Sequence, residues 1–252
     1  MPTPFTHLEI AQRLLKDDRI PTNQRNFLLA HSDAFLLGNI AADARVGSGM
    51  PREHTHFYQY GQTITEHPWL VMINQNPDLL TPFSPEQQAF VAGYVAHLSV
   101  DEYWSKHMVA PHFMGKEWDT RSVQFKIYML HIILIVMDER DFTRIERWQY
   151  DRLASAKPNR WMSFITDHDL SVWQNLIAIQ IHPQGKSETL EILGKRVVKT
   201  PQEIRALLDS EPDMQYNLWQ YIPKVVLANV EVGMYAHARE QMVCYLHDSG
   251  HG

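Results

Sequence analysis

Cysteine and long apolar runs are what this 252-residue sequence has least of. Its only cysteine is Cys244, which excludes an intramolecular disulfide and a zinc site made of several thiolates from one chain. The longest apolar run, residues 128–139, contains His131 and falls short of the ~20 residues needed to span a bilayer. The first residues show neither the basic nor the apolar segment of a signal peptide, so we expect a cytoplasmic protein without a transmembrane segment.

Excess positive charge and glycine-rich phosphate loops are also missing. The formal net charge is −6, which argues against a broad nucleic-acid-binding surface, because such surfaces are basic. No segment has the glycine spacing of a Walker or dinucleotide-binding loop, and alternating strand patterns are nearly absent. A fold built on a parallel sheet is therefore not expected.

Helical periodicity is present along most of the chain. Apolar residues recur at helical spacing in the segments 7–17, 22–43, 84–110, 122–139, 144–155, 169–182, 200–210 and 216–247. The segment 44–68 is rich in Gly, Pro, Thr and His and has no such period, so it is expected to be an ordered loop. We predict an all-α, multi-helix bundle.

Capping signals define several of these helices. Ser84 precedes Pro85 and predicts the start of a long central helix that ends before Pro111. Thr200 and Thr6 are expected to cap two further helices, and Pro223 is expected to kink the last one.

His97 and Asp101 lie four residues apart in the central helix. Four residues make about one helical turn, so both side chains share a face and can reach one metal ion. The alternative is a plain His–Asp hydrogen bond across the turn, which would satisfy a partly buried histidine. Other side chains that can converge with them in a bundle are His7, Asp43, His54, His56 and His107.

Histidine and carboxylate ligands suit zinc and also tolerate other divalent metals. Three protein ligands leave one position on the metal for water, and this position is where chemistry occurs. Two ions that share a bridging carboxylate activate a water and stabilise a leaving alkoxide, which suits the hydrolysis of phosphoesters.

Four segments resemble the zinc-dependent phospholipase C family, which shares its fold with the P1-type nucleases. THLEIAQRLL (6–15) looks like the family's first helix with its metal-binding histidine, and GNIAADAR (38–45) is similar to a segment that ends in a metal-binding aspartate. THFY (55–58) looks like the SHFY ligand element, and GYVAHLSVDEYWSKH (93–107) resembles the family's H-x3-D-x5-H helix. The segments follow the family's order, and the resemblance covers residues 4–110.

The resemblance implies a set of ligands. A first zinc ion would be held by Asp43, His56, His97 and Asp101. Asp101 would bridge to a second zinc ion held with His7, Asp43 would double as general base, and His107 would belong to a third site. The site would lie within residues 4–140 of a single domain spanning 1–252, with a helical C-terminal extension over 141–252.

The sequence departs from the family in two ways. The H-x3-E ligand pair expected after the central helix is missing, and Met1 stands where the family's processed proteins offer an N-terminal tryptophan. One or two ions are therefore expected. His54 is expected to support the site or to point away from it, and His131, seven residues before Asp138, is an outside candidate to replace the missing pair.

We interpret the chain as a metal-dependent phosphoesterase that uses a metal-activated water on a small-molecule or lipid phosphoester. Phospholipid headgroups, nucleic-acid ends and small phosphodiesters all fit this chemistry, and the oligomeric state stays open. One alternative is a non-catalytic helical interaction protein with a structural or degenerate metal site. A further alternative is an HD-type phosphohydrolase, prompted by His168–Asp169 and His247–Asp248.

Overall fold

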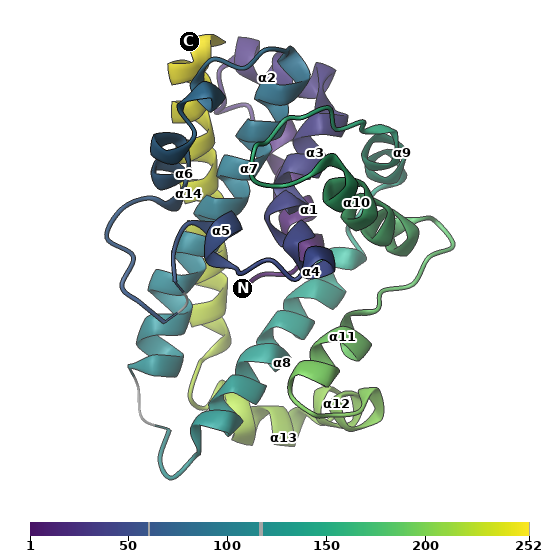
Figure 1. Cartoon of the computed structure of the whole chain (residues 1–252). Helices are drawn as coiled ribbons and strands as arrows, with labels where there is room; N and C mark the ends of the chain where they lie inside the picture. Colours follow the sequence, from purple (N-terminus) through teal and green to yellow (C-terminus); the bar gives the residue numbers. More distant parts are fainter. Residues whose placement is uncertain (60, 116–117, 252) are drawn as a thin grey trace.

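The computed structural model describes residues 1–59, 61–115 and 118–251, and these residues form helices and turns without a β-strand (Figure 1). The longer helices are α1 (Pro4–Lys16), α2 (Thr22–Ala30), α3 (Ser32–Ala41), α6 (Pro68–Gln75), α7 (Pro85–Trp104), α8 (Val123–Phe142), α9 (Arg147–Ser155), α10 (Asp167–Ile181), α11 (Thr189–Arg196), α12 (Pro201–Leu208) and α14 (Lys224–Leu246). The short, 3-10 or π-helical segments are η1 (Ala42–Ala44), α4 (Arg45–Ser48), α5 (Glu53–His56), η2 (Pro77–Leu80), η3 (Ser105–Met114), α13 (Glu211–Met214), η4 (Gln215–Trp219) and η5 (His247–His251). The predicted all-α fold is confirmed.

Helix α7 is the buried axis of the bundle. Its first turn is capped as predicted, since the Ser84 hydroxyl accepts a hydrogen bond from the Gln87 amide at 3.1 Å. From Gln87 to Glu102 every side chain of α7 is buried. Helix α3 packs along one side of α7, and the long helix α14 packs along another (Figure 1). Side chains on α7 therefore meet residues from both ends of the chain.

Two glycines let α3 and α7 cross at backbone contact. A Cβ atom on Gly38 of α3 would lie 2.0 Å from the Phe90 carbonyl oxygen, and one on Gly93 of α7 would lie 2.2 Å from the Phe35 carbonyl oxygen. Only glycine fits at such a crossing. Both glycines belong to the segments that resemble the family, and their contact sets the distance between Asp43, just after α3, and His97 on α7.

Four predicted helix ends are wrong. The central helix does not end before Pro111, because the π-helical segment η3 continues it through that proline to Met114. The segment 22–43 does not form one helix, because His31 leaves the helical conformation at φ −113° and ψ 37° and separates α2 from α3. The first helix starts at Pro4 after Thr3 instead of after Thr6, since a proline suits the first helical turn. Pro223 does not kink a helix but precedes α14 as its N-cap residue.

The segment 44–68 is more helical than predicted, since it contains α4 and α5. Each short helix ends at a residue with positive φ: Gly49 at 71° and Phe57 at 58°. The loop expected around His54 and His56 is therefore a helical turn instead. The α5 turn still separates the two side chains, because His56 is buried and His54 is exposed.

No helix within the described residues is both long enough and apolar enough to cross a membrane.

The glycine crossing makes a prediction about stability. Replacing Gly38 by Ala should lower the free energy of unfolding by about 1–3 kcal/mol, because the new methyl group forces α3 away from α7. The measurement is a guanidinium denaturation curve. Gly47→Ala is the control, since its Cβ would meet only a Val172 methyl carbon at 3.9 Å; it should leave stability unchanged or raise it by up to ~1 kcal/mol. Equal effects of the two substitutions would contradict the close crossing.

Candidate metal centre

The carboxylate of Asp101 lies fully buried on α7 and is surrounded by histidine rings. Its Oδ1 atom lies 3.5 Å from His7 Nε2, and its Oδ2 atom lies 3.4 Å from His56 Nε2 and 3.6 Å from His97 Nε2. Three elements far apart in sequence, α1, α5 and α7, meet here. The two oxygens of one carboxylate face different histidines.

His97 has a fixed tautomer. Its Nδ1 atom lies 2.8 Å from the carbonyl oxygen of Asn39. A carbonyl only accepts, so Nδ1 carries the proton and donates it. In the neutral ring the lone pair is then on Nε2, the atom that points at Asp101. A backbone partner of this kind is typical of a metal-ligating histidine.

His56 is oriented in the same way by its neighbour. The Thr55 hydroxyl donates to the Arg52 carbonyl oxygen at 3.2 Å and lies 2.9 Å from His56 Nδ1. Since the hydroxyl proton is used, Nδ1–H donates to Thr55 Oγ1 and Nε2 keeps its lone pair. The Tyr94 hydroxyl holds this turn against α7 by donating to the Thr55 carbonyl at 2.7 Å.

Among the described residues, His7 has no such hydrogen-bond partner. Its ring stacks on His97 with centroids 3.9 Å apart and planes 12° apart. Both ring nitrogens of His7, Nε2 of His97 and Oδ1 of Asp101 are buried and make no hydrogen bond within the part of the chain that the structure describes. Burying several unsatisfied polar atoms together is costly. A cation between them would remove that cost, so the donor set fits a metal ion.

Asp43 completes the cluster from the η1 turn. Its Oδ1 atom lies 3.6 Å from His56 Nε2, and its side chain is 22% exposed. A tetrahedral zinc ion about 2.0–2.1 Å from each ligand places neighbouring ligand atoms about 3.4 Å apart. The separations of His56 from Asp43, of His56 from Asp101 and of His97 from Asp101, which are 3.4–3.6 Å, match that spacing. The ligand atoms form two groups, His7–His97–Asp101 and Asp43–His56–His97.

Burial and neighbouring charges shift the pKa values of the clustered side chains. Burial lowers the pKa of His7, and the nearby His97 lowers it further. Burial and the charge of Arg52 lower the pKa of His56 well below its ordinary value. For His97 the effect of burial is outweighed by the Asp101 carboxylate, so the pKa is raised. Burial opposes ionisation of Asp101, but His97 and His7 hold its pKa well below the usual range.

Arg52 and Tyr58 are functional candidates that the sequence analysis missed. Arg52 Nη2 donates to Asp101 Oδ2 at 3.0 Å and to the Tyr58 hydroxyl at 2.9 Å, and its guanidinium lies over the Tyr58 ring. The sequence signal that could have pointed to Arg52 is its position four residues before His56, which places both side chains on one helical turn. A positive charge beside Asp101 helps to offset the cost of burying that carboxylate.

The remaining predicted residues lie outside this cluster. His107 is exposed and stacks on Tyr103 at 4.0 Å, and His54 is exposed on α5. His131 contacts the Ile127 carbonyl oxygen at 2.8 Å. Its predicted companion Asp138 instead accepts hydrogen bonds from the hydroxyls of Thr3 and Thr189, and burial raises its pKa to about 7.

The HD-type alternative has no support in the geometry. His168 on α10 and His247 near the C-terminus are both exposed. Neither belongs to a group of potential metal ligands among the described residues.

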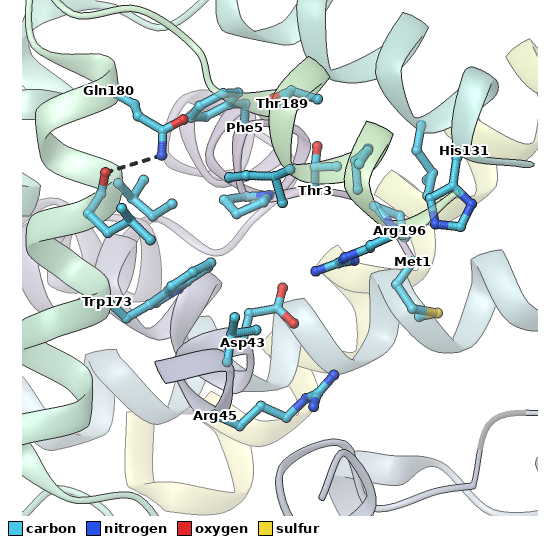
Figure 2. Close-up of a pocket in the computed structure, with 18 of the residues that line it drawn as sticks. Met1, Thr3, Phe5, Asp43, Arg45, His131, Trp173, Gln180, Thr189 and Arg196 are labelled. Atoms are coloured by element: carbon cyan, nitrogen blue, oxygen red, sulfur yellow. Dashed lines mark hydrogen bonds between the residues drawn. The ribbon is translucent and has the colours of Figure 1, made fainter. Parts of the chain in front are cut away.

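A cavity of about 320 Å³ opens beside the cluster, and Asp43 and Arg52 belong to both. Its walls come from the first residues of the chain and from α8, α10 and α11. Most of the lining is apolar, with Arg45, Arg52 and Arg196 as its cations. Figure 2 shows Arg196 reaching toward the Asp43 carboxylate, with Arg45 on the other side of it. The cavity can therefore present these arginines and the candidate ligand Asp43 to a bound anion.

Removing the partner of His56 should weaken the metal centre. Thr55→Ala is expected to lower zinc affinity by about 10–100-fold, because the ring loses the hydroxyl that fixes its tautomer. The measurement is a competition titration against a chelator. Thr55→Ser keeps the hydroxyl and should stay close to wild type. Equal affinities of the two variants would rule out this role for the hydroxyl.

The pKa directions predict how zinc affinity depends on pH. His7 and His56 have lowered pKa values and lose their protons at a lower pH than a free imidazole, whereas His97 has a raised pKa and keeps to higher pH a proton that zinc must displace. Affinity should therefore rise about tenfold per pH unit up to the pKa of His97 and then level off. The same titration in a series of buffers measures this slope. A slope of two or three protons would mean that His7 and His56 titrate as well.

The comparisons with known proteins agree with this geometry. A family model described as zinc dependent phospholipase C matches residues 6–170. No curated protein and no solved structure matches the chain significantly. The match continues past residue 110, where the resemblance in the sequence ended, through α8 and α9 into α10. Since it spans more than half of the 252 residues, the chain belongs to the zinc dependent phospholipase C family.

Proposed function

We propose that this protein is a zinc-dependent phosphoesterase that cleaves an anionic phosphoester carrying an apolar portion. The observation that carries the proposal is that the ligand cluster and the cavity share residues. The cluster of unsatisfied ligand atoms around Asp101 shares Asp43 and Arg52 with an apolar cavity that holds further arginines. Family membership supports a zinc phosphoesterase independently.

The ligand geometry favours one principal ion and a weaker second position. Asp43, His56, His97 and Oδ2 of Asp101 would hold the first ion. His97 has a single available nitrogen, so it cannot serve both groups of ligands at once. His7 and Oδ1 of Asp101 remain for a second ion, which makes Asp101 the bridge and leaves positions on that second ion for water. Bound zinc supplies Lewis acidity toward a phosphoryl oxygen and makes a water nucleophilic at neutral pH.

Asp43 is suited to act as the general base. It is the one carboxylate of the cluster that is partly exposed, and it lines the cavity in which substrate would lie. One of its oxygens faces His56, so the other is left to accept the proton of the attacking water. A group in this role must be within hydrogen-bond reach of that water.

The lining of the cavity supports the choice of substrate class. Arginine forms paired hydrogen bonds with phosphate oxygens, so Arg45, Arg52 and Arg196 favour a negatively charged phosphoester over one with a cationic headgroup. Val46, Leu176 and Ile192 line the cavity and are also 37–48% exposed. This apolar rim would accept an acyl chain or another apolar group of the substrate.

The experiment measures how fast the zinc-loaded protein hydrolyses two short-chain phospholipids. One is an anionic lipid with a glycerol headgroup, and the other carries a cationic choline headgroup. Hydrolysis should be faster for the anionic lipid, and Asp101→Asn should abolish it. Arg196→Met should lower kcat/KM for the anionic lipid by about tenfold or more, because a charge-assisted hydrogen bond to phosphate is lost. The neighbouring Lys195 is exposed and lies outside the cavity lining, so Lys195→Met is the matched control.

Two outcomes would count against the proposal. A fully zinc-loaded protein that hydrolyses no phosphodiester or phosphomonoester would favour the non-catalytic metal-binding interpretation. Equal rates for both headgroups, with no effect of Arg196→Met, would retain the hydrolase and reject the anionic substrate.

A further inference from the structure

A second set of potential metal ligands lies on another side of α7. It joins His67, the N-cap residue of α6, to Glu102 of α7 and His237 of α14. Glu102 directly follows Asp101, and successive helical residues point about 100° apart. The set therefore shares no ligand with the Asp101 cluster.

The two imidazoles converge on one carboxylate oxygen. His67 Nδ1 lies 2.9 Å from Glu102 Oε2, and His237 Nε2 lies 3.1 Å from the same atom. The ring centroids are 5.5 Å apart. All three ligand atoms lie within 4.8 Å of one another. These separations need to widen by only a few tenths of an ångström to reach the about 3.4 Å spacing of a tetrahedral zinc site.

The surroundings allow metal entry. Glu102 is 1% exposed, whereas the His67 side chain is 38% exposed and that of His237 is 18% exposed. The buried carboxylate therefore lies beneath two imidazoles that face solvent. Lys106 donates to the other oxygen, Oε1, at 2.6 Å, and His67 Nδ1 also lies 3.0 Å from Oε1. Oε2 is the oxygen that both histidines approach. The Lys106 side chain is 37% exposed, so the ammonium group can turn toward water.

We propose that His67, Glu102 and His237 form a separate zinc site that ties the start of α6 and helix α14 to α7. Two histidine nitrogens and one carboxylate oxygen are a typical zinc ligand set, and a water molecule would fill the fourth position on the solvent side. The ion would cross-link three segments that are distant in sequence. This proposal does not rest on the phosphoesterase activity.

Zinc content is the first test. Protein is equilibrated with excess zinc, freed of unbound metal by gel filtration and analysed by plasma mass spectrometry. The double variant His67→Ala/His237→Ala should hold one zinc ion fewer than wild type. His31→Ala is the matched control, because His31 lies 3.5 Å from Glu86 as a single His–Glu pair outside the ligand groups of the described residues. Equal zinc content in wild type and in a double variant with unchanged helical circular dichroism would overturn the site.

A second measurement needs only the wild-type chain, so it does not depend on the variant folding. Zinc-soaked crystals measured on both sides of the zinc absorption edge should give an anomalous peak between His67 and His237. A map without this peak would overturn the site, whether or not the Asp101 cluster holds zinc. The activity of the double variant is read separately, so loss of this site and failure of the hydrolase proposal are distinguishable.

Discussion

The burial of one carboxylate, Asp101, is the constraint on which the site depends. An ionised carboxylate deep in a helical core costs several kcal/mol unless positive charge and hydrogen bonds surround it. Here that compensation comes from four side chains: the rings of His7, His56 and His97, and the guanidinium of Arg52. Because these atoms leave several ligand positions unsatisfied, the arrangement is one that a cation would complete.

Backbone packing makes this arrangement possible. The contact of α3 and α7 at Gly38 and Gly93 brings the Asn39 carbonyl to His97 and the η1 turn, with Asp43, to the edge of the cluster. The segments that resemble the family therefore contain two kinds of information. Some of their residues are candidate ligands, and the glycines set the spacing between the helices that present those ligands.

Helix α7 contributes a carboxylate to two separate sets of histidines, because its neighbours bury it on all sides. Asp101 faces α1 and the α5 turn, while Glu102 faces the start of α6 and helix α14. The later helices also complete the cavity, since α8, α10 and α11 supply most of its apolar wall and Arg196. These helices contain none of the short motifs that resemble the family, yet they shape the space in which a substrate would lie.

The sequence by itself determined the helical class, the caps at Ser84 and Thr200, and the candidates His7, Asp43, His56, His97 and Asp101, which lie together. These depend on local periodicity, on capping chemistry and on short motifs. Only the tertiary structure decided that His107 faces away, that Arg52 contacts Asp101, and that His237 approaches Glu102. Such contacts join residues up to 135 positions apart. They depend on how whole helices cross, which no local pattern specifies.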